Sequence, residues 1–124
     1  MRKGCYMKRI IQTMAMCVAI VLSAKLGRVS FPDGRTETYY DLPMHKIVQQ
    51  ATEKNIPGEF WIREDGVKMY GDFVIVAANF KTHPYGSIVE TSLGPGIVLD
   101  TGEFAKKEPY TIDIAADWKK GDNI

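Results

Sequence analysis

Two aspartates occupy positions where a carboxylate requires an explanation. Asp100 ends an apolar strand and opens a turn, and Asp113 stands between two isoleucines of another predicted strand. Aspartate is disfavoured in strands, so we look for a chemical or a structural reason. If folding brings the two acids together, proximity and burial raise the pKa of one carboxyl, which then transfers a proton near neutral pH. Paired acids of this kind cleave glycosidic bonds.

A structural interpretation of the same two residues stays open. Strand alternation would let Asp113 face water, and Asp100 would accept hydrogen bonds from the amides of its own turn. The residue pattern alone does not decide between proton transfer and turn stabilisation.

Other kinds of site find little support in the sequence. His45 and His83 have no histidine or cysteine partner at metal-ligand spacing, so we expect no metal. No phosphate-binding glycine loop and no Gly-x-Ser-x-Gly elbow occurs, and we expect no cofactor. Trp61 and Trp118 suit either a packed core or stacking on a sugar.

The first 24 residues have the layout of an export signal. Four basic residues and no acid precede the mostly apolar run 10–24. That run is shorter than the roughly 20 residues that span a bilayer. We expect residues 1–24 to be a signal peptide or signal-anchor, with a buried cytosolic helix as the third possibility. The rest would then be secreted or extracytoplasmic, attached to the membrane by residues 10–24 if the signal stays uncleaved. Both cysteines, Cys5 and Cys17, lie inside this leader, so no disulfide is expected beyond it.

Charge and composition limit the partners that the remainder can have. The whole chain carries a net charge of +1, but residues 25–124 contain 12 basic and 15 acidic residues, a net charge of −3. An acidic domain does not bind nucleic acid by phosphate neutralisation, so no nucleic-acid partner is expected. With 124 residues, 45% of them hydrophobic, the chain suits one packed domain, which we place at residues 39–124.

The predicted elements give a mainly β fold with one helix. Residues 25–38 are expected to form a linker or a short strand. A helix is predicted from near Asp41, which would cap it, to Asn55, with one apolar face formed by Met44, Ile47, Val48 and Ala51. Five or six short strands separated by turn residues favour a small β-barrel: a hairpin over residues 59–70 with Asp65-Gly66 in its turn, and strands within 72–80, 87–93, 97–100 and 111–115.

The segment from Gly71 to Ile114 resembles a known family. The stretches GDFVIVAAN, HPYGSIVE, GPGIVLDTG and IDIA are similar to the 3D domain, which is named for three aspartates. That domain occurs in cell-wall enzymes of the membrane-bound lytic transglycosylase A type and in small exported muralytic proteins of Gram-positive bacteria. The resemblance implies a six-stranded double-psi β-barrel, here preceded by the amphipathic helix.

The resemblance also implies roles for individual residues. Asp100 and Asp113 match the second and third family aspartates, and Asn79 replaces the first. Asp113 would transfer the proton, Asp100 would assist it electrostatically, and Asn79, Thr101 and Gly102 would bind substrate. The implied reaction cleaves the bond between N-acetylmuramic acid and N-acetylglucosamine in peptidoglycan, without a cofactor. Because an amide does not titrate, Asn79 supports the alternative of a non-catalytic β-barrel that binds a cell-envelope glycan or protein.

Overall fold

The computed structural model describes residues 28–30 and 36–118, so the expected leader and much of the expected linker lie outside the described residues. Within this part of the chain, no helix has the length and hydrophobicity required to cross a bilayer. The described elements are, in chain order, β1 (Arg28–Ser30), β2 (Thr36–Tyr40), α3 (His45–Glu53), β3 (Phe60–Ile62), β4 (Lys68–Tyr70), β5 (Phe73–Ala77), β6 (Ile88–Thr91), β7 (Gly94–Asp100), α4 (Phe104–Lys107) and β8 (Thr111–Ala115).

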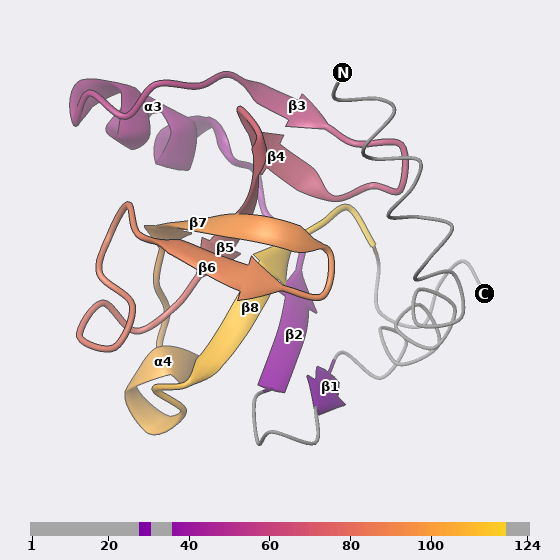
Figure 1. Cartoon of the computed structure of the whole chain (residues 1–124), viewed down its shortest axis with the longest axis vertical. Coiled ribbons are helices and arrows are strands. Elements are labelled where there is room, and N and C mark those ends of the chain that lie inside the picture. The colour runs from indigo at the N-terminus through magenta and orange to yellow at the C-terminus, as the bar shows by residue number, and fades with distance from the viewer. Residues whose placement is uncertain (1–27, 31–35, 119–124) are drawn as a thin grey trace.

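The fold is mainly β, with a single sheet that curls into a half-barrel (Figure 1). Strand β5 lies at its centre. One edge of β5 pairs with β4 near its start and with β8 near its end, and both pairings are antiparallel. The other edge pairs with β7 in parallel, and β7 forms a hairpin with β6. On the far side of β8, β2 pairs in parallel and β1 follows. The predicted mainly β class is therefore confirmed, and eight strands are described where five or six were expected.

The sequence of β5 explains its central place. Its core residues Val74, Ile75 and Val76 are completely buried, as β-branched side chains are when a strand is covered on both faces. Alternate side chains enter two hydrophobic clusters, one on each face of the sheet. The first cluster consists of Val67, Met69, Val74, Val76, Ala78, Val98, Ile112 and Ile114. The second consists of Met44, Ala51, Tyr70, Ile75, Ile97, Leu99 and Ala115.

Helix α3 lies against the second cluster through Ala51, with Ile47 and Val48 packed beside it. The helix begins after Met44, and no side chain caps its first turn. The expectation that Asp41 caps the helix is wrong. Its carboxylate instead binds the Nζ of Lys68 at 2.6 Å, because the Lys68 ammonium is almost buried on β4 and needs a charged acceptor.

The predicted hairpin is confirmed, since β3 and β4 pair with Asp65 and Gly66 in the turn. Gly66 has a φ of +89°, which other residues rarely adopt, and a Cβ there would lie 2.1 Å from Oδ1 of Asp117. All three residues of β3, Phe60–Ile62, are exposed at the end of the sheet. The hairpin therefore extends the sheet without burying this strand.

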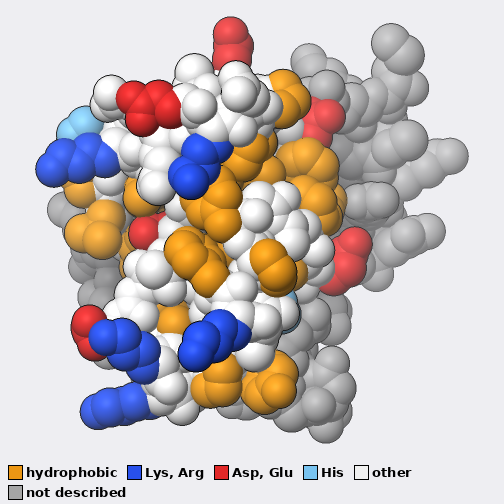
Figure 2. Space-filling view, turned by 90° about the vertical axis from the view of Figure 1, so that its left-hand side faces the viewer, with side chains coloured by type: hydrophobic (Ala, Val, Ile, Leu, Met, Phe, Trp, Pro, Cys, Tyr) orange, Lys and Arg blue, Asp and Glu red, His pale blue; other side chains and the backbone are white. Residues whose placement is uncertain are grey.

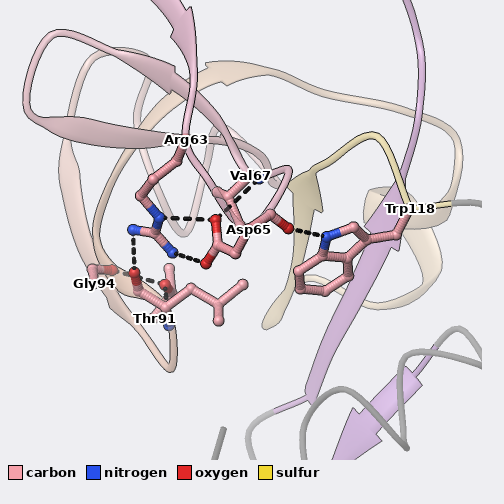
Figure 3. A network of polar contacts seen from close by, with 7 residues as sticks. Arg63, Asp65, Val67, Thr91, Gly94 and Trp118 are labelled. Atoms are coloured by element: carbon pink, nitrogen blue, oxygen red, sulfur yellow. Dashed lines mark hydrogen bonds and ion pairs between the residues drawn. The ribbon is translucent and has the colours of Figure 1, made fainter. Parts of the chain in front are cut away.

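Polar contacts attach the turn of this hairpin to its neighbours, as Figure 3 shows. The Arg63 guanidinium donates two hydrogen bonds to the carboxylate of Asp65, at 2.9 and 2.8 Å, and a third to the carbonyl of Leu93, at 2.9 Å. The indole of Trp118 donates to the backbone carbonyl of Asp65. The β3–β4 turn is thereby fixed to the β6–β7 turn and to the segment after β8.

Residues 36–38 belong to β2, because their extended backbone pairs with β8. Of the two expectations for residues 25–38, the short strand is therefore confirmed for these three residues and the linker is not. The short helix α4 was not predicted. It follows the turn after β7, and its four residues are too few to produce a helical period in the sequence.

Candidate functional site

The site centres on Ala77, which the sheet places between the two aspartates. Ala77 is paired with Asp100 of β7 on one side and with Asp113 of β8 on the other. The Cα atoms of the two acids are thus two strand spacings apart, roughly 10 Å. The side chain between them at this register is a methyl group. The structure therefore brings together the two residues that the sequence singled out.

An irregularity in β7 turns Asp100 toward Asp113. Val76 pairs with Val98, but the next residue, Ala77, pairs with Asp100, so Leu99 is an extra residue in the strand. Strict alternation would send the Asp100 side chain to the face opposite that of Leu99. The extra residue resets the alternation, as a β-bulge does. Asp100 consequently points to the face on which Tyr40 of β2 lies, and the two side chains are hydrogen bonded.

Asp113 is partly buried and is paired in register with Thr38 of β2. The Thr38 hydroxyl donates a hydrogen bond of 2.7 Å to its Oδ1. Burial, which disfavours the charged form, is the main reason that the pKa of Asp113 is raised to about 6. The Thr38 hydrogen bond lowers this pKa, and the charge of Asp100 raises it further. Asp113 can therefore hold or release a proton in the pH range that general acid and base catalysis needs.

Asp100 receives donors on both of its oxygens. The backbone N–H of Thr101 donates to Oδ1 at 2.8 Å, and the Tyr40 hydroxyl donates to Oδ2 at 3.1 Å. The pKa of Tyr40 is raised above its ordinary value by burial first, and then by the charges of Asp100 and Asp113. Tyr40 therefore keeps its proton and acts as a donor.

Asn79 holds a loop together. Its amide group donates to the carbonyl of Ala105 at 2.9 Å, and its Oδ1 accepts hydrogen bonds from the backbone N–H groups of Lys81 and Thr82, at 2.7 and 3.3 Å. An aspartate could accept those two bonds but could not donate to Ala105. The asparagine at this position thus suits a contact between the β5–β6 loop and α4.

The two other predicted substrate-binding residues follow Asp100 directly. Thr101 is exposed, and Gly102 is partly exposed. The ring of Phe104 lies close to Gly102, so that a Cβ there would be 3.2 Å from it. Thr101 orients Asp100 through its amide, and both residues stand next to the acid pair.

Sequence reasoning missed the contributions of Thr38 and Tyr40. Both belong to the TETYY segment, in which alternate residues point to opposite faces of the sheet. Two β-branched threonines and two tyrosines in five residues are typical of a strand. That composition was the available signal, but the parallel pairing of β2 with β8 could not be read from it.

A hollow in the surface lies apart from the acid pair, between α3 and β3. It is lined by Met44, His45, Val48, Gln49 and Phe60. Figure 2 shows the side of the molecule that carries α3, the β5–β6 loop and α4, where hydrophobic side chains lie among lysine and arginine side chains. On the same side, the ammonium of Lys54 lies 5.2 Å from the centre of the Tyr85 ring.

No group of three or more histidine, cysteine, aspartate or glutamate side chains suited to a metal ion occurs within residues 28–30 and 36–118. The side chains of the site are instead two carboxyls, one phenol and one aliphatic hydroxyl, a set that can hold and transfer a proton. Comparison of the chain with models of protein families, with curated proteins and with solved structures finds no match.

Proposed function

We propose that this protein is an exported cell-wall enzyme of the lytic transglycosylase kind, in which Asp113 serves as general acid and then as general base. One observation carries the proposal: Asp113 shares a sheet face with a second carboxyl and has a pKa raised to about 6. A carboxyl with that pKa is protonated often enough to act as an acid and remains a competent base afterwards.

The reaction places both proton transfers on Asp113. Protonated Asp113 donates its hydrogen to the oxygen that joins N-acetylmuramic acid to N-acetylglucosamine, and the bond from that oxygen to C1 breaks. Asp113, now a carboxylate, takes the proton of the 6-hydroxyl of the same muramic acid residue. The oxygen of that hydroxyl bonds to C1 and forms a 1,6-anhydro product without water. Asp100, oriented by hydrogen bonds from Tyr40 and Thr101, stabilises the positive charge that develops at C1.

Thr101, Gly102 and Asn79 would border the bound glycan on the side of the β5–β6 loop and α4. The curled sheet would form the larger part of a six-stranded double-psi barrel, with β7 and β8 carrying the two acids on either side of β5. Residues 1–24 would direct export, after which the domain meets peptidoglycan outside the cytoplasm.

The test is digestion of purified peptidoglycan by the full chain, with mass spectrometry of the soluble products. We expect muropeptides with 1,6-anhydro ends, and we expect Asp113→Asn to lower their rate of release by roughly 100-fold or more. Glu53→Gln is a matched control, because it also replaces a carboxylate with an amide, on the exposed side of α3. Equal activity of Asp113→Asn and the wild type would exclude the mechanism.

A second function is favoured by the way Asn79 is used. Its amide is engaged in loop contacts, and both aspartates accept hydrogen bonds from the protein itself. These contacts suit a non-catalytic module that binds a cell-envelope glycan or protein. In that case the wild type would bind peptidoglycan in a sedimentation assay and release no anhydro products.

A further inference from the structure

Strand β3 forms one end of the sheet. It pairs with β4, and among the described strands no other lies beside it (Figure 1). Its three residues, Phe60, Trp61 and Ile62, are apolar, and all of them are exposed. Edge strands usually carry a charge, a proline or a bulge, because their unpaired backbone groups otherwise pair with another chain. Strand β3 contains none of these.

Strand β6 is also an edge strand, and it shows such protection. Among the described strands it pairs only with β7, and it exposes Ile88. It also carries Glu90, an exposed acid that would lose water if a second strand paired with β6. Of these two edges, β3 is therefore the one suited to accept another strand.

The hydrogen bonds between β3 and β4 determine which backbone groups of β3 point outward. The N–H of Arg63 donates to the carbonyl of Val67 at 2.9 Å. Bonded pairs occur at every second residue of an antiparallel ladder, so Trp61 also directs its N–H and C=O toward β4. The N–H and C=O groups of Phe60 and Ile62 therefore point away from β4. Within residues 28–30 and 36–118, the structure gives these groups no partner.

A second copy of this chain is complementary to these outward groups in one register. Two β3 strands can run antiparallel with Trp61 of one copy opposite Trp61 of the other. Phe60 of each copy then pairs with Ile62 of the second copy. Both residues of such a pair direct their N–H and C=O groups at each other, so each pair forms two hydrogen bonds. The result has a two-fold axis, as most homodimer interfaces do.

The side chains of β3 fit the same register. Phe60 pairs with Tyr70, a member of the second hydrophobic cluster, so Phe60 and Ile62 lie on the face of the sheet that carries α3. In the pair of strands, these two apolar side chains would cover each other. Trp61 lies on the opposite face, where its indole donates a hydrogen bond of 2.7 Å to the carbonyl of Gly71. This bond orients the indole before association, so that less conformational entropy is lost when two indoles come side by side.

Opposite charges flank the apolar residues of β3. Glu59 precedes the strand and Arg63 follows it. In the register centred on Trp61, Glu59 of each copy lies opposite Arg63 of the second copy, while Arg63 keeps its own bonds to Asp65. A register shifted by two residues would place Glu59 or Arg63 opposite Trp61 instead. Cross-strand charge pairing therefore favours the register centred on Trp61.

We propose that β3 is the surface through which two copies of this chain associate, as an antiparallel pair of strands centred on Trp61. The pairing continues the sheet of one copy into the sheet of the other. Because each strand contributes three residues, the contact is small, and the dimer is weak and depends on protein concentration. The association requires neither the two aspartates nor a substrate.

Sedimentation equilibrium of the full chain measures this association. We expect a monomer–dimer equilibrium with dimer present at protein concentrations of about 1 mM or less. Ile62→Lys places a charge in the edge strand and should raise the Kd of the dimer by roughly tenfold or more. Ile88→Lys is the matched control, because Ile62 and Ile88 are both 49% exposed and both lie on edge strands. It should dimerise like the wild type.

Ile62→Pro tests the backbone hydrogen bonds separately. The N–H of Ile62 points outward, so proline removes a donor from the dimer and none from the β3–β4 ladder. We expect it to weaken the dimer as Ile62→Lys does, with a circular dichroism spectrum like that of the wild type. The proposal is wrong if the wild type stays monomeric up to about 1 mM, or if both folded Ile62 variants dimerise like the wild type.

Cross-linking tests the register. In a chain with Cys5→Ser and Cys17→Ser, Trp61→Cys places two thiols at a pair without hydrogen bonds, where Cα atoms lie about 4.5 Å apart, within the range of disulfides. Oxidation by oxygen should then give a dimer that a reductant separates. Ile88→Cys in the same background should remain monomeric on denaturing gels. Cross-linking of Ile88→Cys without cross-linking of Trp61→Cys would overturn the proposal.

Discussion

Glu37 and Asp113 lie on adjacent strands of one sheet, but the surroundings of their carboxyl groups differ. Glu37 of β2 is fully buried and pairs with Ile112, one residue before Asp113 on β8, so the two acids belong to opposite faces. Both oxygens of Glu37 accept hydrogen bonds from Ser92, one from its backbone N–H at 2.9 Å and one from its hydroxyl. Asp113 is less buried, has Thr38 as its one donor within the described part of the chain, and lies near the negative charge of Asp100.

Depth of burial therefore does not distinguish a structural carboxylate from a reactive one. What distinguishes these two is that donors reach both oxygens of Glu37 but, among the described residues, only one oxygen of Asp113, which also lies near the charge of Asp100. Glu37 fixes the turn between β6 and β7 to β2. Asp113 is left incompletely compensated, which costs stability when it is charged and makes it available for proton transfer.

The largest expected effect comes from removing the structural acid. Glu37→Ala leaves two partly buried donors of Ser92 without an acceptor and opens a cavity beside the first cluster, because the Glu37 side chain is fully buried. We expect a loss of about 3–5 kcal/mol in the free energy of unfolding, measured by urea denaturation at pH 7. A variant as stable as the wild type would show that the Glu37 contacts contribute nothing to the fold.

Replacing Asp113 is expected to raise the free energy of unfolding, whereas replacing Glu37 lowers it. The pKa of Asp113 is about 6 in the folded chain and near 3.8 when unfolded, so the folded state binds its proton more tightly. This preference stabilises the fold below pH 4 and is lost as the pH rises through 6. Asp113→Asn removes the cost of burying the charge, and we expect it to be more stable than the wild type at pH 8 by about 2 kcal/mol.

Urea denaturation of the wild type and of Asp113→Asn at pH 4, 6 and 8 shows which of the two is more stable at each pH. The advantage of Asp113→Asn over the wild type should shrink as the pH falls and should vanish below pH 4. A variant less stable than the wild type at pH 8 would mean that Asp113 stabilises the fold in its charged form.

The smallest effect is expected from removing one of the two donors that Ser92 provides to Glu37. Ser92→Ala removes the hydroxyl donor of Glu37 and keeps the backbone donor. We expect it to lower the free energy of unfolding by about 0.5–1.5 kcal/mol, less than Glu37→Ala does, because one hydrogen bond to Glu37 remains. Thermal melting of the single and double variants checks this order, and the double variant should lose less than the sum of the single losses.

Of the two acids compared here, Asp113 could be singled out from the sequence and Glu37 could not. Asp113 was found because an aspartate between isoleucines is unusual in a strand. The hairpin was found because Asp65-Gly66 is typical of a tight turn. Glu37 was missed because its segment was assigned to a linker or a short strand, where a charged residue attracts no notice.

The shared face of the two aspartates also could not be predicted. Alternation along β7 would direct Asp100 away from Asp113, and the bulge at Leu99 that reverses this leaves no mark in the residue types. Likewise Tyr40 joins the site through a pairing of distant strands. Side-chain chemistry was thus visible in the sequence, whereas the register that combines the side chains was not.

The parallel pairing of β2 with β8 has a consequence for the order of folding. Thr38 and Asp113 are 75 positions apart, and closing so long a loop is slow compared with forming the local hairpins. During synthesis the β3–β4 and β6–β7 hairpins can form before β8 has left the ribosome. The acid pair is therefore among the last features to be completed, and a chain that is shortened before residue 111 lacks Asp113 as well as the partner strand of β2.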